Sequence, residues 1–549
     1  MRDKGKPLLT VIPSSHWNSE EVCDEKFTTM ESGFLRVRLC IVRIGSCSAT
    51  NFTRFVFWFS RPKPQIIENH IVAWDTIDAD HVWDIAHQSS FRLFQLYICR
   101  PTMMEATPAA DVSSSETLPP FPQRPLNSTS RLSKDSVSIV GLGCSSFSTF
   151  FWSQQDWEAA ADNGETNDHK RSDKSTETGK PANQFTVDTL QEDHPIVRSW
   201  IDTIHYALLE AGITLLDTAP WYGHGTSEVV IGWALKKLLA KKPRNQFFVN
   251  TKVGRSESDP RRQFDFSKGA VLESVQRSVR RLQCEYIDVL QLHDPEFAPT
   301  IDILFQEAIP ALLECRDKYK YCKALGMTGY PLTVQHQLLE RSMEVYKTNI
   351  WDQALTYGHY TLHDTSLWQR TFVKDLESPK WTSYGDYCQS QGIRVLSAAP
   401  LSMGLLTPQG PPAWHPASSE LQNACHEIVR LCRAQGVDVA RLATIFALSE
   451  PRIACTILGM KDISEIQAAQ RAAAKIPTDR NKTFDARTIQ KEALSEAEFS
   501  LLERIMDPLQ GPFASVWGDK GFEEWDGIAA VREFYMQLPD IATQPWQQA

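Results

Sequence analysis

The stretch "VRSWIDTIHYALLEAGITLLDTA", residues 197–219, contains the repeating unit that decides the fold. Apolar side chains recur at helical spacing along one face of its first part: Trp200, Ile204, Ala207 and Leu208. This period predicts an amphipathic helix, and Gly212 is typical of the residue that stops one. The short apolar run that follows, residues 214–219, is typical of a buried strand. The stretch therefore predicts a helix that leads directly into a strand.

The same alternation extends along the chain from residue 132 onward. Longer amphipathic segments separate eight short apolar runs: VSIVGLG (137–143), TLLDTA (214–219), FFVNTK (247–252), IDVLQLH (287–293), CKALGMTG (322–329), IWDQALTY (350–357), IRVLSAAP (393–400) and IACTILGM (453–460). Strands that alternate with helices indicate a parallel sheet, and eight such units predict an α/β fold, the (β/α)8 TIM barrel. A doubly wound open sheet is the structural alternative. It is disfavoured because GLGCSS (141–146) is an incomplete dinucleotide fingerprint and leads into a loop.

The regions around the predicted barrel differ from it in composition. The sequence divides into an N-terminal extension (1–105), a flexible linker rich in Pro, Ser and Thr (106–131), the barrel (132–530) and a C-terminal tail (531–549). Either the extension is poorly ordered, or translation starts at Met103 or Met104 and the native protein lacks it. Residues 153–195 are polar and charged and predict a disordered insertion after the first strand. It should emerge at the C-terminal face of the barrel, as a lid or as a plain surface loop.

Composition excludes several classes of function. The formal net charge of −10 argues against nucleic-acid or anionic-membrane binding, since both need a basic surface. No run approaches the roughly 18 apolar residues of a membrane helix, and the N-terminus is a poor signal peptide. Twelve cysteines occur without a CxxC pair, which predicts reduced thiols, no metal site and a cytoplasmic location.

Ionisable side chains follow three consecutive predicted strands. The second strand ends at Asp217, with Tyr222 in the loop after it, the third ends at Lys252, and the fourth at His293. Active sites of barrels lie at the C-terminal ends of the strands. Each residue alone has a structural explanation, as a turn former, a solvated lysine or a satisfied histidine. Together they predict a proton-transfer site.

The expected chemistry divides into separate roles. Lys252 should lower the pKa of the Tyr222 phenol, and Asp217 should hold the lysine charged and oriented. His293 should donate a hydrogen bond to the substrate oxygen, while Tyr222 acts as the general acid or base.

These four residues resemble the catalytic tetrad of the aldo-keto reductases, in the order of that family. The resemblance covers roughly residues 132–475 and implies a (β/α)8 barrel that binds a nicotinamide cofactor without a Rossmann domain. Two further motifs, GMTGYPL (326–332) and APLSMGLLTPQGPPAWHPAS (399–418), resemble the aldonolactone-forming branch. That branch contains plant L-galactose dehydrogenases and fungal D-arabinose 1-dehydrogenases.

The resemblance also implies which residues bind ligands. The substrate-binding candidates are Trp221, Trp414 and His415, and the cofactor-binding candidates are Thr328, Gly329, Gln353, Pro400, Leu401, Met403, Gly459, Met460, Lys461 and Glu465. Two departures from the wider superfamily concern the pose of the nicotinamide. Thr328 and Gly329 stand where most relatives have Ser-Asn, and Ala398 stands where many have a stacking tyrosine.

The loop and helix start at residues 457–470 should receive the adenosine phosphates, because backbone amides at a helix N-terminus favour anions. Glu465 stands where NADP-preferring relatives have an arginine, which favours NAD. Lys461 favours NADP, the alternative cofactor.

The resulting hypothesis is an NAD(P)-dependent aldose 1-dehydrogenase. It would oxidise the anomeric carbon of a small-molecule sugar to an aldonolactone, with D-arabinose, L-galactose and L-fucose as implied substrates and Tyr222 as the base. The first alternative is an NADPH-dependent reductase of aldehydes or ketones, in which Tyr222 donates the proton. The second is a non-catalytic barrel that serves as a binding protein; it would require a damaged tetrad, which the sequence does not show.

Overall fold

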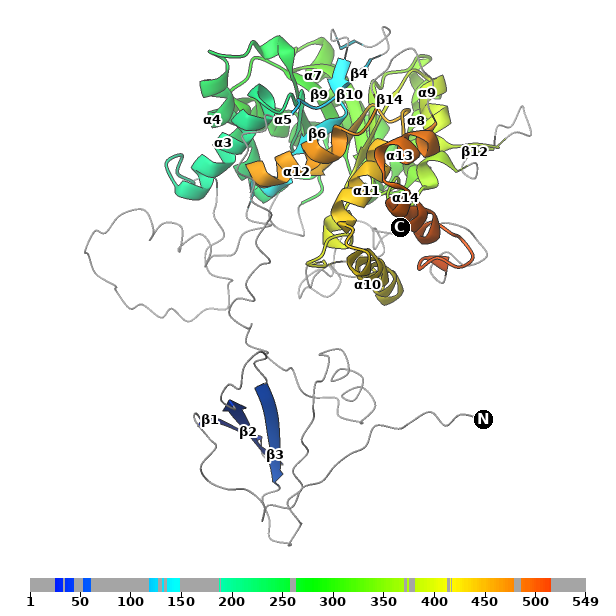
Figure 1. Ribbon diagram of the computed structural model, residues 1–549. Coiled ribbons are helices and arrows are strands. Elements are labelled where there is room, and N and C mark those ends of the chain that lie inside the picture. Colours follow the sequence, from blue (N-terminus) through cyan, green and yellow to red (C-terminus); the bar gives the residue numbers. More distant parts are fainter. Residues whose placement is uncertain are drawn as a thin grey trace, which may run out of the picture. The chain divides into compact units, whose positions relative to one another are not determined.

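The computed structural model describes three strands within residues 25–60, together with residues 118–514. The second part has gaps at 127–130, 133–135, 149–186, 188, 257–262, 370–372, 375–380, 412–414, 416 and 478–484. The chain divides into two units, Met1–Ser114 and Ser115–Ala549. In the first unit β1 (Glu25–Ser32), β2 (Leu35–Arg43) and β3 (Thr53–Ser60) form an antiparallel sheet in that order (Figure 1).

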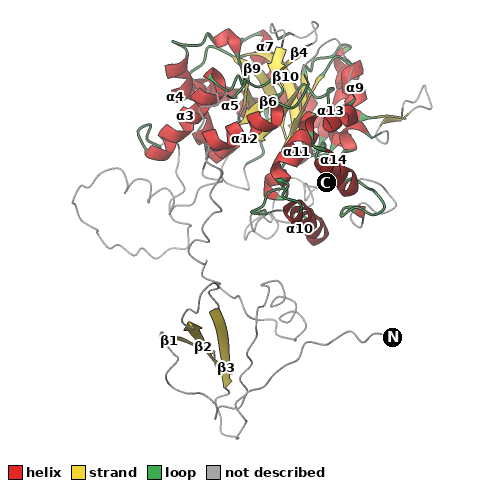
Figure 2. Ribbon diagram, viewed as in Figure 1, coloured by secondary structure: helices red, strands yellow, loops and turns green. Residues whose placement is uncertain are grey.

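The second unit is built around a closed barrel of eight parallel strands (Figure 2). Around the barrel the strands are β6 (Val140–Gly143), β7 (Leu215–Asp217), β8 (Phe248–Val253), β9 (Ile287–His293), β10 (Cys322–Gly329), β11 (Gln353–Tyr357), β14 (Arg394–Ala398) and β15 (Cys455–Gly459). Each lies within, or within one residue of, one of the eight predicted runs. The (β/α)8 barrel is therefore confirmed.

The first predicted strand is divided in two. Its beginning, β5 (Ser136–Ser138), pairs antiparallel with β4 (Gln123–Pro125), and only β6 enters the barrel. Part of the predicted linker thus belongs to the barrel unit. Phe121 is buried there, and its N–H donates to the Ala211 carbonyl oxygen at 2.7 Å. The other predicted domain boundaries stay predictions, and the part of the predicted insertion from 153 to 186 lies outside the described residues.

Helices surround the barrel (Figure 1). They are α3 (Pro195–Leu209), α4 (Thr226–Leu238), α5 (Lys268–Leu282), α6 (Ile301–Ile303), α7 (Ile309–Asp317), α8 (Leu332–Tyr346), α9 (Tyr384–Ser390), α10 (Ser419–Ala434), α11 (Val439–Leu448), α12 (Ile463–Ala473), α13 (Ala486–Ala493) and α14 (Glu496–Ile505). Serine or aspartate side chains cap many of their N-termini, as at Ser267 for α5 and Asp462 for α12. Such caps satisfy backbone N–H groups that have no partner within the helix. Two further strands, β12 (Val373–Lys374) and β13 (Trp381–Thr382), form a small antiparallel pair.

The barrel interior has two layers. The lower layer is an apolar cluster that includes Val137 of the hairpin and one residue from most strands, such as Leu215, Phe248, Val289 and Leu355. Side chains alternate between the two faces of a strand, so positions two or four residues further along also face inward. Lys252 is such a position on β8, and it belongs to a polar upper layer at the C-terminal ends of the strands.

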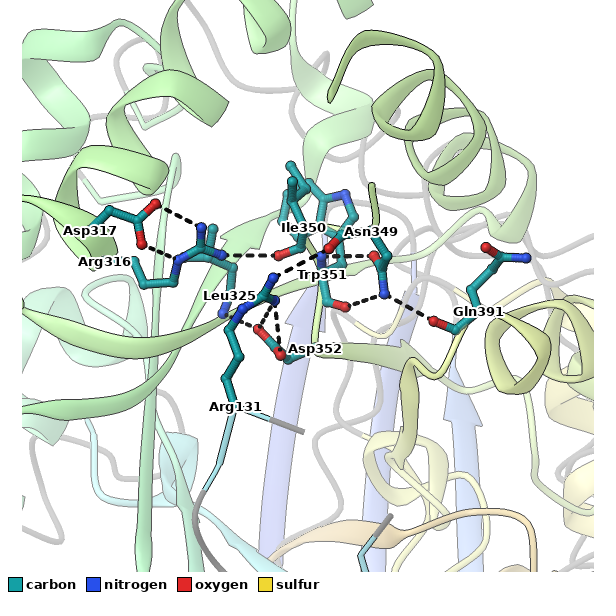
Figure 3. Close-up of polar contacts among 9 residues, drawn as sticks. All are labelled: Arg131, Arg316, Asp317, Leu325, Asn349, Ile350, Trp351, Asp352 and Gln391. Atoms are coloured by element: carbon teal, nitrogen blue, oxygen red, sulfur yellow. Dashed lines mark hydrogen bonds and ion pairs between the residues drawn. The ribbon is translucent and has the colours of Figure 1, made fainter. Parts of the chain in front are cut away.

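A hydrogen-bonded network closes the N-terminal end of β11 (Figure 3). The Asp352 carboxylate accepts hydrogen bonds from the Leu325 N–H at 3.1 Å and from the Arg131 guanidinium at 3.2 Å. The Asn349 amide donates to the carbonyl oxygens of Trp351 and Gln391 at 2.8 and 3.0 Å. These contacts lie at the end of the barrel opposite the predicted site, where contacts contribute to stability.

None of the helices among the described residues is both long and apolar enough to cross a bilayer.

Candidate active site

The turn after β7 returns Tyr222 to the barrel mouth. Gly223, His224 and Gly225 all have left-handed backbone angles, with φ of 56°, 55° and 100°. Glycine adopts this conformation without strain. At Gly225 a Cβ would also lie 2.3 Å from the guanidinium carbon of Arg281. The tight reversal explains how a residue five positions after Asp217 can reach the same site.

Three of the predicted catalytic residues are in direct contact. The Lys252 ammonium donates to Asp217 Oδ2 at 2.6 Å, to the Thr218 carbonyl oxygen at 2.9 Å and to the Tyr222 hydroxyl at 3.2 Å. Lys252 and Asp217 are almost fully buried. The three donor positions of the ammonium group are thereby used, and one of them points at the phenol oxygen.

His293 faces the same phenol from the next strand. Its ring lies edge-on to that of Tyr222, with the centroids 6.4 Å apart. Burial, together with the charges of Lys252 and Arg255, lowers the pKa of His293 well below 6.5. The imidazole is therefore neutral at physiological pH and carries one N–H donor. This is the state in which it can donate to a substrate oxygen.

A chain of amides holds the aspartate in place. The Gln291 amide donates to Asp217 Oδ1 at 2.9 Å, and the Gln353 amide donates to Gln291 Oε1 at 3.2 Å. The sequence prediction missed Gln291, although it lies two residues before His293 and therefore on the same face of β9. Both oxygens of Asp217 are thus engaged, which keeps its carboxylate aimed at Lys252.

The expected effect on the tyrosine was wrong in its net direction. Burial raises the pKa of Tyr222 above 10, and this effect outweighs the lowering by Lys252. Burial also acts to lower the pKa of Lys252, but Asp217 and Tyr222 outweigh it, so the lysine pKa is raised. The lysine is charged throughout the physiological range, and the phenol is protonated at neutral pH in the ligand-free enzyme.

Two charged residues missed from the sequence extend the site. Arg255, just beyond β8, donates to Asp294 Oδ2 at 2.9 Å, and Asp294 directly follows His293. The Arg255 guanidinium also lies over the Trp221 ring, 4.1 Å from its centroid. Trp221, predicted to bind substrate, is therefore stacked beside the mouth. A signal was present, because both charged residues follow strand ends.

Comparison with known proteins identifies the origin of this arrangement. The sequence profile of the Aldo/keto reductase family matches residues 197–488, more than half of the chain. The chain is an aldo-keto reductase.

Named relatives agree with that assignment. L-Galactose dehydrogenase of Arabidopsis thaliana is 35% identical over 294 residues, which cover 54% of this chain and 81% of that protein. D-Arabinose 1-dehydrogenase of Saccharomyces cerevisiae is 34% identical over 272 residues, 49% of this chain and 74% of that protein. A solved structure of the aldo-keto reductase AKR11C1 from Bacillus halodurans is 22% identical, covers 70% of this chain and 97% of its own, and has a TM-score of 0.44. This aldo-keto reductase is an oxidoreductase of a family that uses NAD(P)H.

The residues predicted to bind the nicotinamide fit that group. Gln353 Oε1 is buried and has no hydrogen-bond partner among the described residues. Such an acceptor suits the amide of a carboxamide. Thr328, near the end of β10, and Gln353, the first residue of β11, would hold that group. Gly329 follows Thr328 on the same strand. Further around the mouth the loop after β14 contains Pro400, Leu401 and Met403, the last with φ of 50°.

The segment predicted to receive the adenosine phosphates lies at the end of β15. Gly459 is exposed, Met460 is buried, and Lys461 is exposed just before α12. Glu465 Oε2 accepts a hydrogen bond from the Lys461 N–H at 2.8 Å. A groove of about 540 Å³ lies beside this segment, lined by Asp462 and Ser464 and by residues at the start of α3. The groove lies next to the N-terminus of α12, and its lining includes the carboxylates of Asp202 and Asp462.

The other two residues predicted to bind the substrate, Trp414 and His415, lie in the loop after β14. Trp414 lies outside the described residues. His415 is buried, its Nε2 bonds the Ser402 carbonyl oxygen at 2.9 Å, and its Nδ1 accepts from the Ala417 N–H at 3.1 Å. Both ring nitrogens hold the loop together. In this aldo-keto reductase His415 therefore acts on the mouth through the loop and offers no hydrogen-bonding nitrogen to a sugar.

Glu296 of this aldo-keto reductase should make its stability depend on pH. Glu296 Oε1 accepts from the Tyr330 N–H at 2.8 Å, and burial, followed by the charge of Asp294, raises the carboxyl pKa to about 8. Between pH 4.5 and 8 the folded protein thus holds a proton that the unfolded chain releases. The free energy of unfolding should therefore fall as the pH rises through this window. Urea denaturation at pH 6 and pH 8.5 measures that fall.

The variant Glu296→Gln isolates this effect, since the amide cannot titrate. Its free energy of unfolding should fall less between the two pH values than that of the wild type. Equal pH dependence in the two proteins would show that Glu296 keeps an ordinary pKa.

Proposed function

We propose that this aldo-keto reductase oxidises the anomeric carbon of a cyclic aldose to an aldonolactone, with NAD as the hydride acceptor. The observation that carries the chemistry is the contact of Tyr222 with Lys252, at 3.2 Å, beside the neutral His293. The sugar is supported by the two relatives named for aldose oxidation, L-galactose dehydrogenase and D-arabinose 1-dehydrogenase. Small polyhydroxylated substrates also suit a mouth that contains Arg255 and Asp294.

The residues divide the reaction among themselves. His293 donates a hydrogen bond to the anomeric oxygen and fixes it next to Tyr222. The phenolate of Tyr222, stabilised by the Lys252 ammonium, accepts the hydroxyl proton. A nicotinamide held by Gln353 and Thr328 would supply the acceptor for the C1 hydride. The C1–O bond becomes the carbonyl of the lactone, and Asp217 keeps the lysine oriented throughout.

A reductase of aldehydes or ketones is the second candidate, and the Tyr222 pKa favours it. Because burial raises that pKa, the phenol is protonated at neutral pH and can donate a proton directly. Oxidation instead needs the phenolate. If the enzyme works as a dehydrogenase, its rate should rise with pH into the alkaline range.

A substrate screen distinguishes the two candidates. Initial rates are measured on D-arabinose, L-galactose and L-fucose with NAD and with NADP, and on simple aldehydes with NADH and NADPH. The proposal expects the highest specificity constant for an aldose with NAD, and a lactone as the product by mass spectrometry. If the enzyme reduces aldehydes with NADPH and oxidises none of the sugars, the proposal is overturned in favour of the reductase.

The preference for NAD rests on Glu465. Its carboxylate would repel a 2′-phosphate and can accept a hydrogen bond from a free ribose hydroxyl. The variant Glu465→Arg should therefore raise the NADP-to-NAD ratio of kcat/KM by about 10- to 100-fold, the difference expected when a charge-assisted contact replaces a repulsion. Steady-state kinetics with both cofactors measure the ratio.

A matched control exists for this charge reversal. Glu420 lies in the first turn of α10, so Glu420→Arg makes the same change at another helix start. It should leave the ratio unchanged. A wild-type enzyme that already prefers NADP would contradict the assignment of NAD, whatever the variants do. The cytoplasmic location also stays a proposal, supported by free, buried cysteines in the described residues.

A further inference from the structure

We propose that Asp294 recognises the substrate: its Oδ1 accepts a hydrogen bond from the hydroxyl on the carbon next to the reacting carbon. This inference rests on the proposed aldose oxidation and names the feature of the sugar that the site selects. Asp294 would make the enzyme prefer 2-hydroxy aldoses to 2-deoxy sugars and to plain aldehydes.

The backbone places Asp294 at the reacting centre. It directly follows His293 at the end of β9 and adopts left-handed angles, φ 48° and ψ 54°. Its N–H donates to the Thr328 carbonyl oxygen at 2.8 Å, which fixes this strained conformation. The turn directs the side chain back along the mouth, so that Asp294 Oδ1 lies 3.7 Å from His293 Nε2.

The surroundings of His293 decide which of its two ring nitrogens can contact the substrate. His293 Nδ1 is buried and makes no hydrogen bond to the part of the chain that the structure describes. Nε2 is therefore the ring nitrogen that a substrate oxygen can reach, and it is the one beside Asp294. An oxygen bound to Nε2 has the Asp294 carboxylate as its neighbour.

Arg255 bonds one carboxylate oxygen of Asp294 and leaves the other oxygen available to a ligand. Its guanidinium donates to Asp294 Oδ2 at 2.9 Å, and its Nε donates to Gln263 Oε1 at 3.1 Å. Asp294 precedes the short helical turn Pro295–Phe297, yet its side chain makes no capping hydrogen bond. Oδ1 accepts no hydrogen bond from the described residues. The ion pair therefore holds the carboxylate with one acceptor oxygen directed at the site.

A sugar supplies the matching donor. Vicinal hydroxyl groups on a pyranose or furanose ring lie side by side, so one can meet His293 while the next meets Asp294. A substrate without the second hydroxyl leaves a desolvated carboxylate oxygen without a donor. Sites built to bond a hydroxyl discriminate strongly against analogues that lack it, because a buried polar group then stays unpaired.

The test compares D-arabinose with 2-deoxy-D-ribose, which is D-arabinose without its C2 hydroxyl. A second pair is L-galactose and 2-deoxy-L-galactose. For each enzyme the ratio of kcat/KM between the sugar and its deoxy analogue is measured with NAD. Asp294→Ala should reduce the wild-type ratio by about 10- to 100-fold, the range for a lost hydrogen bond to a charged group. Asp294→Asn, which keeps an amide oxygen as acceptor, should reduce it less.

The matched control is Asp288, an aspartate on β9, the strand that Asp294 directly follows. Asp288, near the start of β9, is buried and pairs with Arg244 at 2.7 Å. Asp288→Asn also weakens a buried ion pair, so it should lower the thermal midpoint while leaving the ratio unchanged. Thermal midpoints of all variants separate loss of folding from loss of recognition.

The outcomes separate the inference from the function on which it rests. If Asp294→Ala and Asp294→Asn slow both members of a pair equally, Asp294 has only a structural role and the inference is overturned. If the wild type oxidises none of the sugars, the proposed function fails and the inference fails with it. A drop of the ratio in the Asp294 variants alone supports both.

Discussion

Replacing Tyr222 by phenylalanine should reduce kcat by about 10²–10⁴-fold or more, the contribution expected of a general acid or base. The hydroxyl removed is the group that lies 3.2 Å from the Lys252 ammonium, which bonds no other phenol among the described residues. The ring itself remains, with its edge contact to His293, so the shape of the mouth is kept. Turnover is measured in the direction that the substrate screen identifies.

A second tyrosine provides the control for this change. Tyr384 is buried, and its hydroxyl donates to Gln335 Oε1 at 3.0 Å. Tyr384→Phe therefore removes a buried, bonded hydroxyl on α9 and should leave kcat within about twofold, with a small loss of stability, since a typical hydrogen bond contributes about 1 kcal/mol. If Tyr222→Phe lost no more kcat than Tyr384→Phe, Tyr222 would have no role in proton transfer.

Lys252→Met should impair both activity and folding. The variant removes the cation that stabilises the phenolate, so kcat should fall by about 10²-fold or more. It also leaves the Asp217 carboxylate buried without its partner, which costs about 3–5 kcal/mol of unfolding free energy. Steady-state kinetics and urea denaturation at pH 7 measure the two losses.

A double variant separates these effects. In Asp217→Asn/Lys252→Met no buried charge is left alone, so most of the lost stability should return while the activity does not. Full activity in either variant would show that the ion pair is only structural.

The stabilising effect of Lys252 also has a defined pH range. Because the folded state raises the lysine pKa, its contribution to stability is complete below the unfolded value of 10.5. It is lost as the pH rises beyond that value toward the folded pKa. The stability gap between wild type and Lys252→Met should therefore be constant near neutrality and narrow only above about pH 10.5. This behaviour is opposite in sign to that of a stabilised carboxylate, which would lose its contribution in acid.

The barrel could be predicted because its signals are local. The runs at 287–293 and 322–329 match β9 and β10 residue for residue, since each is a short, mainly apolar segment that is buried along most of its length. The run at 137–143 does not, because a hairpin partner divides it. That partner, β4, is a short segment inside a stretch rich in proline, whose composition is typical of a linker.

The tetrad could be predicted because strand ends converge in any barrel of this kind. The roles of residues that depend on the direction or the burial of a side chain could not be predicted from the sequence. Arg255 and Asp294 pair across two loops, and no spacing in the sequence indicates that their rotamers meet. The direction of the Tyr222 pKa shift depends on how burial compares with the lysine charge, and burial is a property of the folded site. The hydrogen bonds of His415 within its own loop could not be predicted for the same reason.

The two layers of the barrel interior place residues that contribute to thermal stability apart from residues proposed to take part in catalysis. Positions such as Val289 and Leu355, in the lower layer, have apolar side chains without charge. Repacking them should therefore change the thermal midpoint of the enzyme more than its turnover per folded molecule. Two or four residues further along the same strands, substitutions should instead change activity or substrate preference. Heat tolerance and substrate range can therefore be engineered independently, from different rows of the same eight strands.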